Sequence, residues 1–377
     1  MYFPLTPEQE MIRMAVEQFA RREVAPGADK RDRTEEFPEE LVRKMAQLGL
    51  CGMMVPSKYG GSEVGAVAYV LAVMEIARAC ASTAVTMSVT NLSCEPLVIA
   101  GTEEQKERLL KPLASGKVLG AFALTEPSAG SNLGEVKLRA RRKGSIYVLN
   151  GSKMFITNGA YAGQIFVLAR TGEGGARGLT AFMVEKKSPG LKIGKAIEKM
   201  GLRASNTVEL IFEDCEVPEE NRIGKEGDGM AIVTRALASG RIGIAGQAVG
   251  MIKACLEEAK KYASQREQFG KPLSGHQAIQ WMIADIATSL EAATLLTLSA
   301  AALKDQGKPY MKEASIAKLF ATESLNQSVY QALQIHGGYG YTKEFPIERI
   351  YRDARVTTIY EGTSEIQKML IARETLK

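Results

Sequence analysis

The fold is decided by the stretch Gly120-Ala121-Phe122-Ala123-Leu124-Thr125-Glu126-Pro127-Ser128-Ala129-Gly130-Ser131-Asn132, where the texture of the sequence changes. Before it the apolar residues follow a helical spacing, and after it short β-type segments alternate with glycine, asparagine and proline. The stretch itself reads as a strand and then a loop of small residues, whose backbone amides and hydroxyls can face a ligand. An ordinary hairpin loop uses the same residue types and remains an alternative. Neither a G-x-G-x-x-G nor a P-loop pattern is present, so the usual nucleotide-binding folds are not indicated.

Upstream, residues 1–119 are expected to form a helical domain. The segment Thr6-Pro7-Glu8-Gln9 is typical of a helix start, because Thr can cap, Pro suits the first turn and Gln follows three residues after the cap. Further helices are expected after Pro38 and over residues 66–79 and 103–113.

No basic or Arg/Ser-rich leader precedes the first expected helix, and no uninterrupted apolar window of membrane-spanning length is found. We therefore expect a cytoplasmic protein without membrane insertion, or a mitochondrial matrix protein whose leader has been removed.

Downstream, residues 120–225 are expected to form a β domain, sandwich-like or barrel-like. Its expected strands are 121–125, 146–149, 154–157, 165–169, 179–184 and 208–212. The segment from Asn150 to Gly159 reads as turn, strand, turn. Phe155 within it suits a core position, or alternatively a site that holds a flat ring.

Residues 226–377 are expected to form a second helical domain that can close as a four-helix bundle. Its expected helices are 230–266, 276–305, 309–335 and 364–374. The predicted fold class is therefore α+β, with an N-terminal helical, a middle β and a C-terminal helical domain.

The composition narrows the class of protein. The 377 residues are 45% hydrophobic and 24% charged, which is ordinary for a globular chain. The net charge of +5 is modest and no long basic run occurs, so nucleic acid is not an expected partner. Five scattered cysteines and two histidines do not provide a conventional metal site, and the cysteines read as reduced core thiols.

The segment Ile359-Tyr360-Glu361-Gly362-Thr363-Ser364-Glu365 carries the most chemistry. Glu361 lies between an aromatic residue and a glycine, just before an expected helix that Thr363 or Ser364 can cap. Such a junction can display a catalytic base. A solvated glutamate that favours the helix dipole is the alternative reading of the same residues.

Two further segments suggest ligand contacts in the last domain. Arg266 ends a helix and can pair with a phosphate, or simply favour the helix dipole. The glycines after His336 permit close backbone approach. His336 is expected to be structural or ligand-contacting rather than catalytic, because no Ser, Cys or metal-ligand partner is spaced to work with it.

Taken in this order, the motifs resemble the acyl-CoA dehydrogenase family over essentially the whole chain, and most closely its short-chain (butyryl-CoA) branch. The resemblance implies the helical, β and helical domains already expected. It also implies a homotetramer in which FAD lies between the β domain, the C-terminal domain and a neighbouring subunit.

The resemblance implies the following substrate contacts. Glu361 corresponds to the catalytic base, with Tyr360 and Gly362 at the thioester. Some relatives carry the base at the position of Gly240, so a glycine there leaves Glu361 without a rival. Arg241 matches a CoA-contacting arginine, and Ser131 is shared between substrate and cofactor. An Asp that is frequent in relatives is Ala238 here, which puts one CoA contact in doubt.

The resemblance also implies cofactor contacts. Many relatives have Trp at the position of Phe155, so ring stacking is expected to survive with a smaller surface. The positions implied in the same subunit are Phe122, Leu124, Thr125, Gly130, Ser131, Phe155, Ile156 and Thr157. Those implied to reach FAD from an adjoining subunit are Arg266, Phe269, Gln277, Gln334, Ile335, His336, Gly337 and Gly338, while Thr363, Ser364 and Glu365 match the stretch beside the adenosine part.

The implied reaction is α,β-dehydrogenation of a short, possibly branched acyl-CoA to the trans-2-enoyl-CoA, a step of fatty acid β-oxidation. Glu361 must be desolvated so that its pKa rises to about 6 or 7. The family supplies the Glu361 backbone N–H and a flavin ribityl hydroxyl to the enolate oxygen, passes hydride to flavin N5, and delivers electrons to electron-transfer flavoprotein.

Other outcomes on the same fold are an oxidase, a desulfinase, or a dehydrogenase of cyclic or dicarboxyl acyl-CoAs. Thr83-Ala84-Val85-Thr86-Met87-Ser88 contains no Arg for a distal carboxylate, which disfavours a dicarboxyl substrate. A non-catalytic CoA- or flavin-binding scaffold is the alternative from a different class. The pocket base is expected to include Thr90, Asn91 and Ser93, which are polar for a long alkyl chain.

Overall fold

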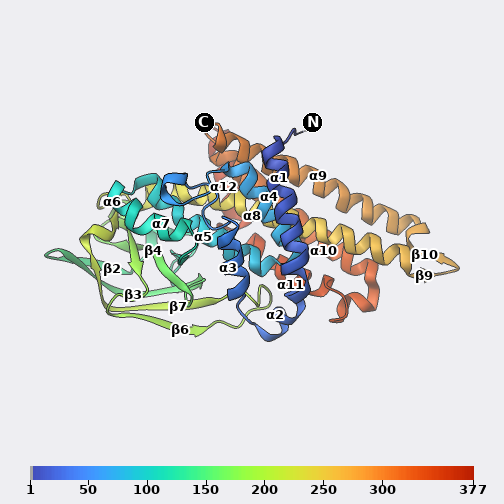
Figure 1. Ribbon diagram of the computed structural model, residues 1–377, viewed down its shortest axis with the longest axis horizontal. Coiled ribbons are helices and arrows are strands. Elements are labelled where there is room, and N and C mark those ends of the chain that lie inside the picture. Colours follow the sequence, from blue (N-terminus) through green and yellow to red (C-terminus); the bar gives the residue numbers. More distant parts are fainter. Residues whose placement is uncertain (1–2) are drawn as a thin grey trace.

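The computed structural model describes residues 3–377, so the first two residues of the expected N-terminal segment lie outside it. A β domain lies at one end of the long axis, and long helices fill the centre and the other end (Figure 1). The two chain termini lie on the same side of the molecule, beside the helices.

The N-terminal segment is helical, as predicted. The expected cap is present, because Thr6 Oγ1 accepts from the Gln9 backbone N–H at 3.2 Å and Gln9 Oε1 accepts from the Thr6 N–H at 3.0 Å. The helices are α1 (Pro7–Phe19), α2 (Ala28–Thr34), α3 (Glu39–Gln47), α4 (Gly65–Ala79), α5 (Ala81–Ala100), α6 (Glu103–Gln105) and α7 (Lys111–Ala114).

Helix α5 was not among the expected helices, because it is rich in Ser, Thr and Val, which favour other conformations. Its hydroxyls bond back along the helix instead. Thr86 donates to the Ser82 carbonyl at 3.2 Å and Ser93 to the Val89 carbonyl at 2.8 Å. Pairing of this kind allows a hydroxyl-rich helix to lie in the middle of the molecule.

The middle segment is a β domain, as predicted. Its strands are β1 (Leu119–Ala123), β2 (Arg139–Lys143), β3 (Ile146–Thr157), β4 (Ala162–Arg170), β5 (Leu179–Glu185), β6 (Leu191–Ala196), β7 (Thr207–Pro218) and β8 (Arg222–Ile223). They run in the order β6-β7-β3-β2-β4-β5-β8, with β1 parallel to β4.

One expected turn is wrong. Residues 150 and 151 do not separate two strands, because β3 continues through them and pairs with β7. Gly151 has φ +140°, and the register shifts between Leu149 and Gly151, so the glycine forms a bulge within the strand.

The sheet folds over its own core. Strands β2 and β4 are joined only at Arg139 and Arg170, so the sheet divides there into two halves. Leu149 and Phe212 from one half share a buried cluster with Val167 and Phe182 from the other. This arrangement agrees with the sandwich-like domain that the sequence predicts.

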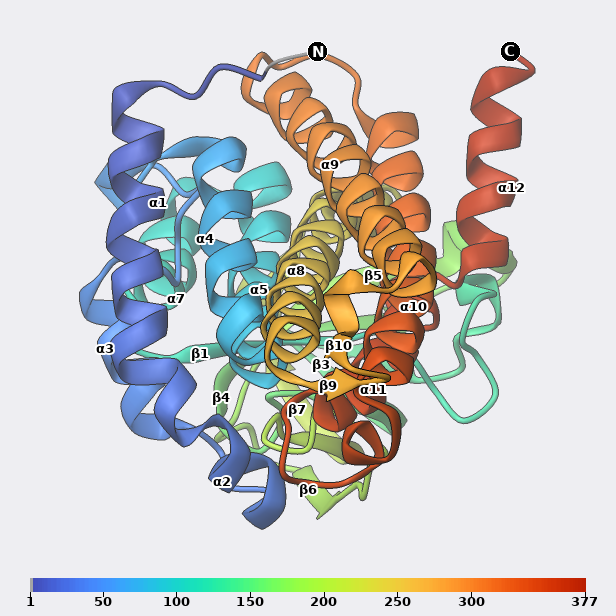
Figure 2. The same cartoon turned by 90° about the vertical axis from the view of Figure 1, so that its right-hand side faces the viewer.

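The C-terminal segment is helical, as predicted, with the addition of the unexpected short helix α11. Its elements are α8 (Gly229–Gln265), β9 (Glu267–Gln268), β10 (Lys271–Pro272), α9 (Gln277–Asp305), α10 (Met311–His336), α11 (Ile347–Ala354) and α12 (Ser364–Thr375). Helices α8, α9 and α10 lie together, while α12 stands to one side (Figure 2).

Helix α8 joins the two helical regions. Gly243, Gly246 and Gly250 face α4, where an added Cβ at Gly250 would overlap the Met74 backbone. Small residues at this spacing let two helices approach closely. Buried residues of α4, α5, α8, α9 and α10 consequently form one continuous core.

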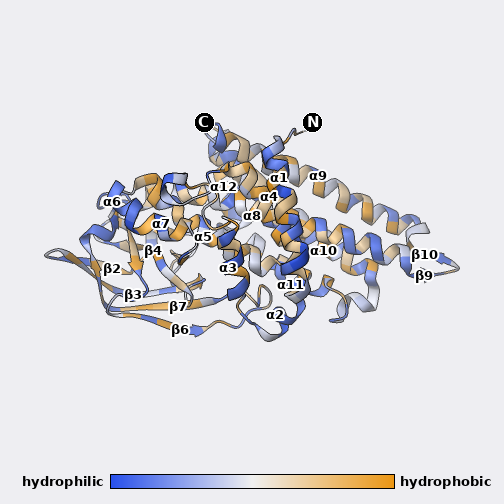
Figure 3. Ribbon diagram, viewed as in Figure 1, coloured by the Kyte–Doolittle hydropathy of each residue, from blue (hydrophilic) through white to orange (hydrophobic). Residues whose placement is uncertain are grey.

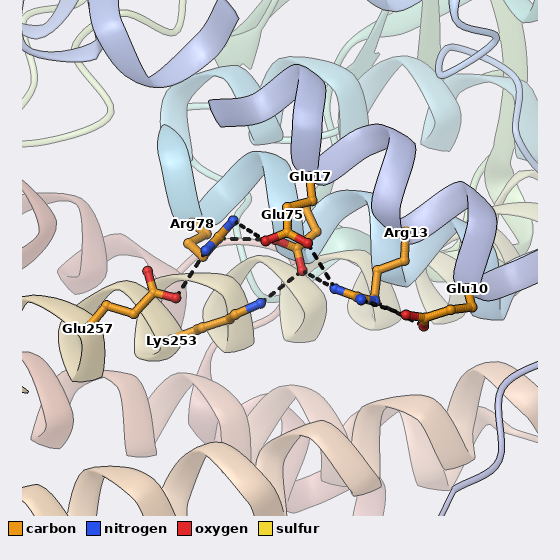
Figure 4. Close-up of polar contacts among 7 residues, drawn as sticks. All are labelled: Glu10, Arg13, Glu17, Glu75, Arg78, Lys253 and Glu257. Carbon is orange, nitrogen blue, oxygen red and sulfur yellow. Dashed lines mark hydrogen bonds and ion pairs between the residues drawn. The ribbon is translucent and has the colours of Figure 1, made fainter. Parts of the chain in front are cut away.

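A buried acid reinforces this contact (Figure 4). Glu75 of α4 lies 2.9 Å from Lys253 Nζ of α8 and 3.1 Å from Arg78 Nε, and Arg13 of α1 reaches it at 3.5 Å. Three cations from three helices therefore surround one carboxylate. Glu10, Glu17 and Glu257 pair with the outer sides of the two arginines.

In helix α9 the apolar residues are interrupted by Asp285 and Glu291, so no uninterrupted window of membrane-spanning length occurs there. By length and composition it is apolar enough to cross a membrane, with a mean hydropathy of 1.5 over its best window, of which 33% is buried. Hydrophobic and hydrophilic residues nevertheless follow one another along it at the edge of the molecule (Figure 3).

Candidate active site

The segment that carries Glu361 is held in an unusual backbone conformation before α12. Glu361 has φ +53° and Gly362 has φ +95°, so two successive residues are left-handed. Thr363 caps α12, with its Oγ1 accepting from the Ile366 N–H at 3.4 Å, which confirms one of the two predicted caps. The Ser364 hydroxyl instead donates to Glu323 Oε1 on α10.

Glu361 is partly buried, and one oxygen of its carboxyl group lies against α8. Its Oε2 is buried and has no hydrogen-bond partner within residues 3–377. An added Cβ at Gly240 would overlap this oxygen, so the carboxyl lies directly on the glycine. Burial raises the pKa of Glu361 to about 7, although Arg241 and Lys318 oppose the rise.

Two side chains hold the backbone beyond this carboxyl. Lys318 Nζ of α10 donates to the Gly362 carbonyl at 2.8 Å, and Gln367 Nε2 of α12 donates to the same oxygen at 2.9 Å. Gln367 Nε2 also lies 3.3 Å from the Glu361 carbonyl. Both carbonyl groups are thereby fixed on the side away from solvent.

Arg241 follows Gly240 on α8 and is 4% exposed. Its Nε and Nη1 are buried without a partner in the described chain, so the guanidinium has donors to spare. Burial lowers its pKa, and the nearby Glu361 carboxylate opposes that change. Ala238 lies buried one turn away and has no polar group.

A tyrosine of α4 contacts α8 close to the place where Glu361 lies on it. The Tyr69 hydroxyl of α4 faces Gly243, one turn of α8 beyond Gly240. Burial raises its pKa, and the negative charge of Glu361 raises it further. On α5, Thr83 Oγ1 is buried without a partner inside residues 3–377, and the Ser88 hydroxyl lies close enough to Tyr69 to oppose the rise of its pKa.

Thr90, Asn91 and Ser93, which are expected at the pocket base, are buried and bonded to backbone groups. Thr90 bonds to the Thr86 carbonyl and Ser93 to the Val89 carbonyl. Asn91 bonds to the backbone of Leu50, Met53 and Met87. These three side chains are already paired, whereas Arg241 and Tyr69 are polar groups whose pKa values respond to the charge of Glu361.

The loop after β1 is fixed by a buried ion pair. Lys153 Nζ of β3 lies 2.8 Å from Glu126 Oε1 and donates to the Leu124 carbonyl at 2.7 Å. Glu126 in turn accepts from the backbone N–H groups of Lys137 and Leu138 at 2.7 and 3.0 Å. The Thr125 carbonyl accepts from the Met154 N–H at 2.8 Å, which ties the loop to β3.

Several predicted cofactor residues in this region point inward. Leu124 is buried in the core between the sheet and the helices that pack on it, Ile156 is buried in the core of the β domain, and Phe122 stacks on Phe166 with the ring centroids 4.5 Å apart. The side chains of Leu124 and Ile156 are therefore turned away from a ligand at this loop. Gly130 and Ser131 are exposed on the loop, whereas Thr125 and Thr157 are partly buried.

Phe155 points outward. It is 62% exposed and has φ +60°, at a register shift of β3 between Lys153 and Ile156. A bulge of this kind turns one side chain out of the strand's alternation. The aromatic face is thus displayed near the end of β3, the strand whose Met154 N–H donates to the Thr125 carbonyl.

A separate cavity of about 480 Å³ gathers five of the predicted residues. Arg266, Ile335, His336, Gly337 and Gly338 line it together with Tyr262. His336 stacks on Tyr262 at 4.3 Å, and its Nε2 is buried without a partner in the described residues. Phe269 is 93% exposed on the adjoining hairpin, and Gln277, Gln334 and Glu365 are exposed as well.

The Glu361 segment and the His336 cavity lie far apart along helix α10, which both of them contact. Lys318, next to the Glu361 segment, and His336, in the cavity, are both on α10. Eighteen residues of helix rise by about 27 Å. The cavity is therefore distant from the carboxyl group of the same chain. Within residues 3–377, no cluster of His, Cys, Asp and Glu is arranged to hold a metal ion.

Sequence reasoning missed Lys318, Gln367, Tyr69 and Lys153. A signal existed for Lys318, because it shares an apolar face of α10 with Ala314, Ala321 and Leu325, all fully buried. A lysine on such a face indicates a specific partner. Tyr69 and Lys153 gave no comparable signal, since their partners lie in distant segments.

Comparison with known families covers nearly the whole chain. The model of the acyl-CoA dehydrogenase N-terminal domain matches residues 6–117, that of the middle domain residues 121–215, and that of the C-terminal domain residues 227–376.

Curated relatives are similar over their full length. The chain is 49% identical to an acyl-CoA dehydrogenase of Bacillus subtilis, covering 99% of each chain. It is 48% identical to an acryloyl-CoA reductase (NADH) of Anaerotignum propionicum, covering 100% of this chain and 96% of the relative. It is 46% identical to a short-chain specific acyl-CoA dehydrogenase of Clostridium acetobutylicum, again covering 99% of each.

Solved structures have the same fold. Butyryl-CoA dehydrogenase from Megasphaera elsdenii superposes with a TM-score of 0.98 at 42% identity, over 100% of both chains. A chain from a structure reported as "Electron transferring flavoprotein of Acidaminococcus fermentans: Towards a mechanism of flavin-based electron bifurcation" gives 0.98 at 44% identity, over 100% of both.

Proposed function

Because the chain belongs to the acyl-CoA dehydrogenase family, we propose that it uses FAD to oxidise a short acyl-CoA, with butyryl-CoA as the first substrate to test. The observation that carries this proposal is the buried, unpartnered carboxyl oxygen of Glu361, lying on Gly240 beside two buried cations.

The residues present fit the FAD on which the family depends. Phe155 offers an exposed aromatic face at the end of β3. At Gly130, Gly337 and Gly338 an added Cβ would meet nothing within 4 Å in the described chain, so a flat or extended ligand can approach the backbone there. His336 Nε2 is a buried polar atom that needs a partner. We assign these positions, with Thr125, Ser131, Thr157 and Arg266, to cofactor binding.

Glu361 acts as the base. An ionised carboxylate in a dry setting is a stronger base than one in water, and a pKa of about 7 matches neutral pH. Glu361 removes the proton from the carbon next to the thioester, while its own backbone N–H stabilises the negative charge that develops on the thioester oxygen. The acceptor for the hydride of the β-carbon would be supplied by bound FAD.

The surroundings of Glu361 support a short acyl group. The Tyr69 hydroxyl lies near the carboxyl group with Ser88 beside it, and Tyr360 donates its hydroxyl to Gln247 Oε1 at 2.5 Å. A long alkyl chain would have to cover these groups, which is unfavourable. Arg241, with two unpartnered nitrogen atoms, is assigned to the CoA part of the substrate, as the family motif implies.

The distance between the two groups of residues supports an active site shared between chains. A cavity about 27 Å along α10 from the base is placed to serve the cofactor of a neighbouring copy. The poorly buried apolar helix α9 begins beside it and provides a surface for that copy. We therefore propose a homotetramer. The similarity to the chain from the electron transferring flavoprotein structure supports electron-transfer flavoprotein as its electron acceptor.

The test is anaerobic reduction of the purified yellow protein. Butyryl-CoA is expected to bleach the flavin absorbance, whereas free CoA is not. A Glu361→Gln variant should retain FAD and slow the bleaching by roughly 10²–10⁴-fold. Glu8→Gln, which removes an exposed carboxylate in the first turn of α1, is the control and should react like the parent. Equal rates for Glu361→Gln and the parent would overturn the assignment of the base.

The similarity to an acryloyl-CoA reductase supports a second candidate function, in which the protein reduces the α,β double bond of an enoyl-CoA instead of forming it. Glu361 would then return the proton to the α-carbon, since a forward and a reverse reaction use the same groups. Rapid anaerobic reoxidation of the reduced protein by acryloyl-CoA, with only slow bleaching by propionyl-CoA, would favour this direction.

A further inference from the structure

We propose that Lys318 is a positioning residue for the base: its buried ammonium group holds the Gly362 carbonyl and places a fixed positive charge beside the Glu361 carboxylate. This inference rests on the proposed function, in which Glu361 takes a proton from the substrate. Gln367 shares the first of these tasks and not the second.

The first step of the argument is geometric. Two successive left-handed residues, one of them a glutamate, are unfavourable unless neighbouring groups hold them. The Lys318 ammonium at 2.8 Å and the Gln367 amide at 2.9 Å converge on one oxygen, the Gly362 carbonyl. They come from α10 and α12, so the segment is fixed between two helices.

The second step concerns the lysine itself. Lys318 is 0% exposed, and the Gly362 carbonyl is the acceptor found for its three donors among residues 3–377. Burial lowers its pKa to about 8, so it remains mostly charged at neutral pH. A methionine would fill the same space without burying a charge. A purely structural role therefore accounts poorly for a lysine here.

The third step concerns charge. Burial raises the pKa of Glu361, and the cations at Arg241 and Lys318 oppose this, so the carboxylate can form at neutral pH in a dry setting. Arg241 comes from α8 and Lys318 from α10, on two sides of the carboxyl. The other charged or titratable groups that act on these two cations are Glu323, Glu365, Tyr310 and Arg373.

The experiment compares three variants of the FAD-loaded protein. Lys318→Met removes the charge and the hydrogen bond, Lys318→Gln removes the charge and keeps a donor, and Gln367→Met removes a donor and no charge. FAD content and thermal unfolding verify that each has folded. The main readout is kcat/KM for butyryl-CoA between pH 5.5 and 9.

Removing the charge is expected to move the acidic limb of this profile upward by roughly one pH unit, because an opposite charge nearby lowers a carboxyl pKa by about that amount or more. At pH 6 the rate then falls about ten-fold for both Lys318 variants. Gln367→Met should lower kcat at every pH and leave the limb where it is. If Lys318→Met does not fold, Lys318→Gln carries the test.

A limb at the parent position in both Lys318 variants would overturn the inference, even with butyryl-CoA oxidised normally. A limb that moves equally in Gln367→Met would also overturn it, since the effect would then follow from the hydrogen bond alone. Infrared titration of the Glu361 carboxyl, with Glu361→Gln as the blank, measures the same pKa without turnover. The charge effect is therefore tested even if no acyl-CoA proves to be a substrate.

Discussion

At the scale of single residues, Glu361 combines properties that oppose stability with properties that a base requires. Its Oε2 is buried without a partner in the described chain, and its backbone is left-handed. Groups of this kind persist where the surrounding structure holds them and where they serve a reaction. Replacement of Glu361 should therefore change the free energy of unfolding as well as the reaction rate.

We predict that Glu361→Gln stabilises the folded protein at pH 8 and not at pH 5. The pKa of Glu361 is about 7 in the folded protein and ordinarily 4.5. The contribution of this carboxyl group to the free energy of unfolding is therefore fully present below pH 4.5 and is lost as the pH rises from there through 7. The neutral amide removes the loss, which we expect to be on the order of 1–3 kcal/mol. Thermal unfolding without substrate at both pH values measures it, and an equal change at pH 5 and pH 8 would contradict the prediction.

Gly240→Ala is expected to displace the base. An added Cβ would overlap Glu361 Oε2, and a displacement of about 1 Å at a reacting group can slow the reaction by roughly 100-fold. FAD content should be unchanged. Gly246→Ala on the same helix is the control, because its Cβ would meet its nearest neighbours at 3.4 Å. Comparable kcat values for Gly240→Ala and the parent would show that the carboxyl does not work from this position.

At the scale of elements, the Thr125 loop depends on a pair inside the β domain. Lys153 is fully buried and Glu126 nearly so, and between them they hold the Leu124 carbonyl and two backbone N–H groups. Burial lowers the pKa of Lys153 to about 8, whereas Glu126 opposes this. The pair thus fixes the end of β1 and the start of the loop that we assign to the cofactor.

Lys153→Met is expected to destabilise the protein by about 3–5 kcal/mol, because Glu126 is left as an unpaired buried charge. The double variant Lys153→Met with Glu126→Gln should be less destabilised than the single one, since no charge remains. Chemical unfolding of the three proteins measures both values. A double variant as unstable as Lys153→Met would show that packing, not charge, holds the loop.

A feature could be predicted from the sequence when its hydrogen-bond partners lie a few residues away, and could not when they lie in a distant segment. The cap at Thr6 and Gln9 and the cap at Thr363 were predicted, because all their partners lie within three residues. The bulge at Gly151 was not, since only pairing with β7 distinguishes it from a turn. Lys318 was missed because its acceptor is 44 residues away, in the very segment that had been identified. The sequence thus indicated the base and not the groups that support it.

At the scale of the whole molecule, α9 leaves apolar side chains without cover. Trp281 is 61% exposed near the start of the helix, close to the hairpin beside the His336 cavity. Exposed apolar surface of this kind marks a place where another molecule binds. In the proposed tetramer that molecule is a second copy of the chain.

Trp281→Glu is expected to lower the molecular mass in solution and, with it, the fraction of protein that retains FAD. A charge at the interface would be desolvated without a partner, which opposes association. Light scattering coupled to gel filtration gives the mass, and the absorbance ratio gives FAD content. Met11→Glu, at a residue 65% exposed on α1, is the control. Trp281→Glu protein that stays tetrameric and fully loaded would place the interface elsewhere.

Helix α10 carries Lys318 near one end and His336 at the other, and it runs between them without a break. Near its middle, Asn326 donates to the Thr322 carbonyl at 2.8 Å and to the Ala354 carbonyl at 3.3 Å. A single continuous helix therefore fixes the position of the Glu361 segment relative to the His336 cavity. Asn326→Pro, which would kink the helix near its middle, is expected to disturb both the Glu361 segment and the His336 cavity. A variant that affects only one of the two sites therefore leaves the helix itself intact.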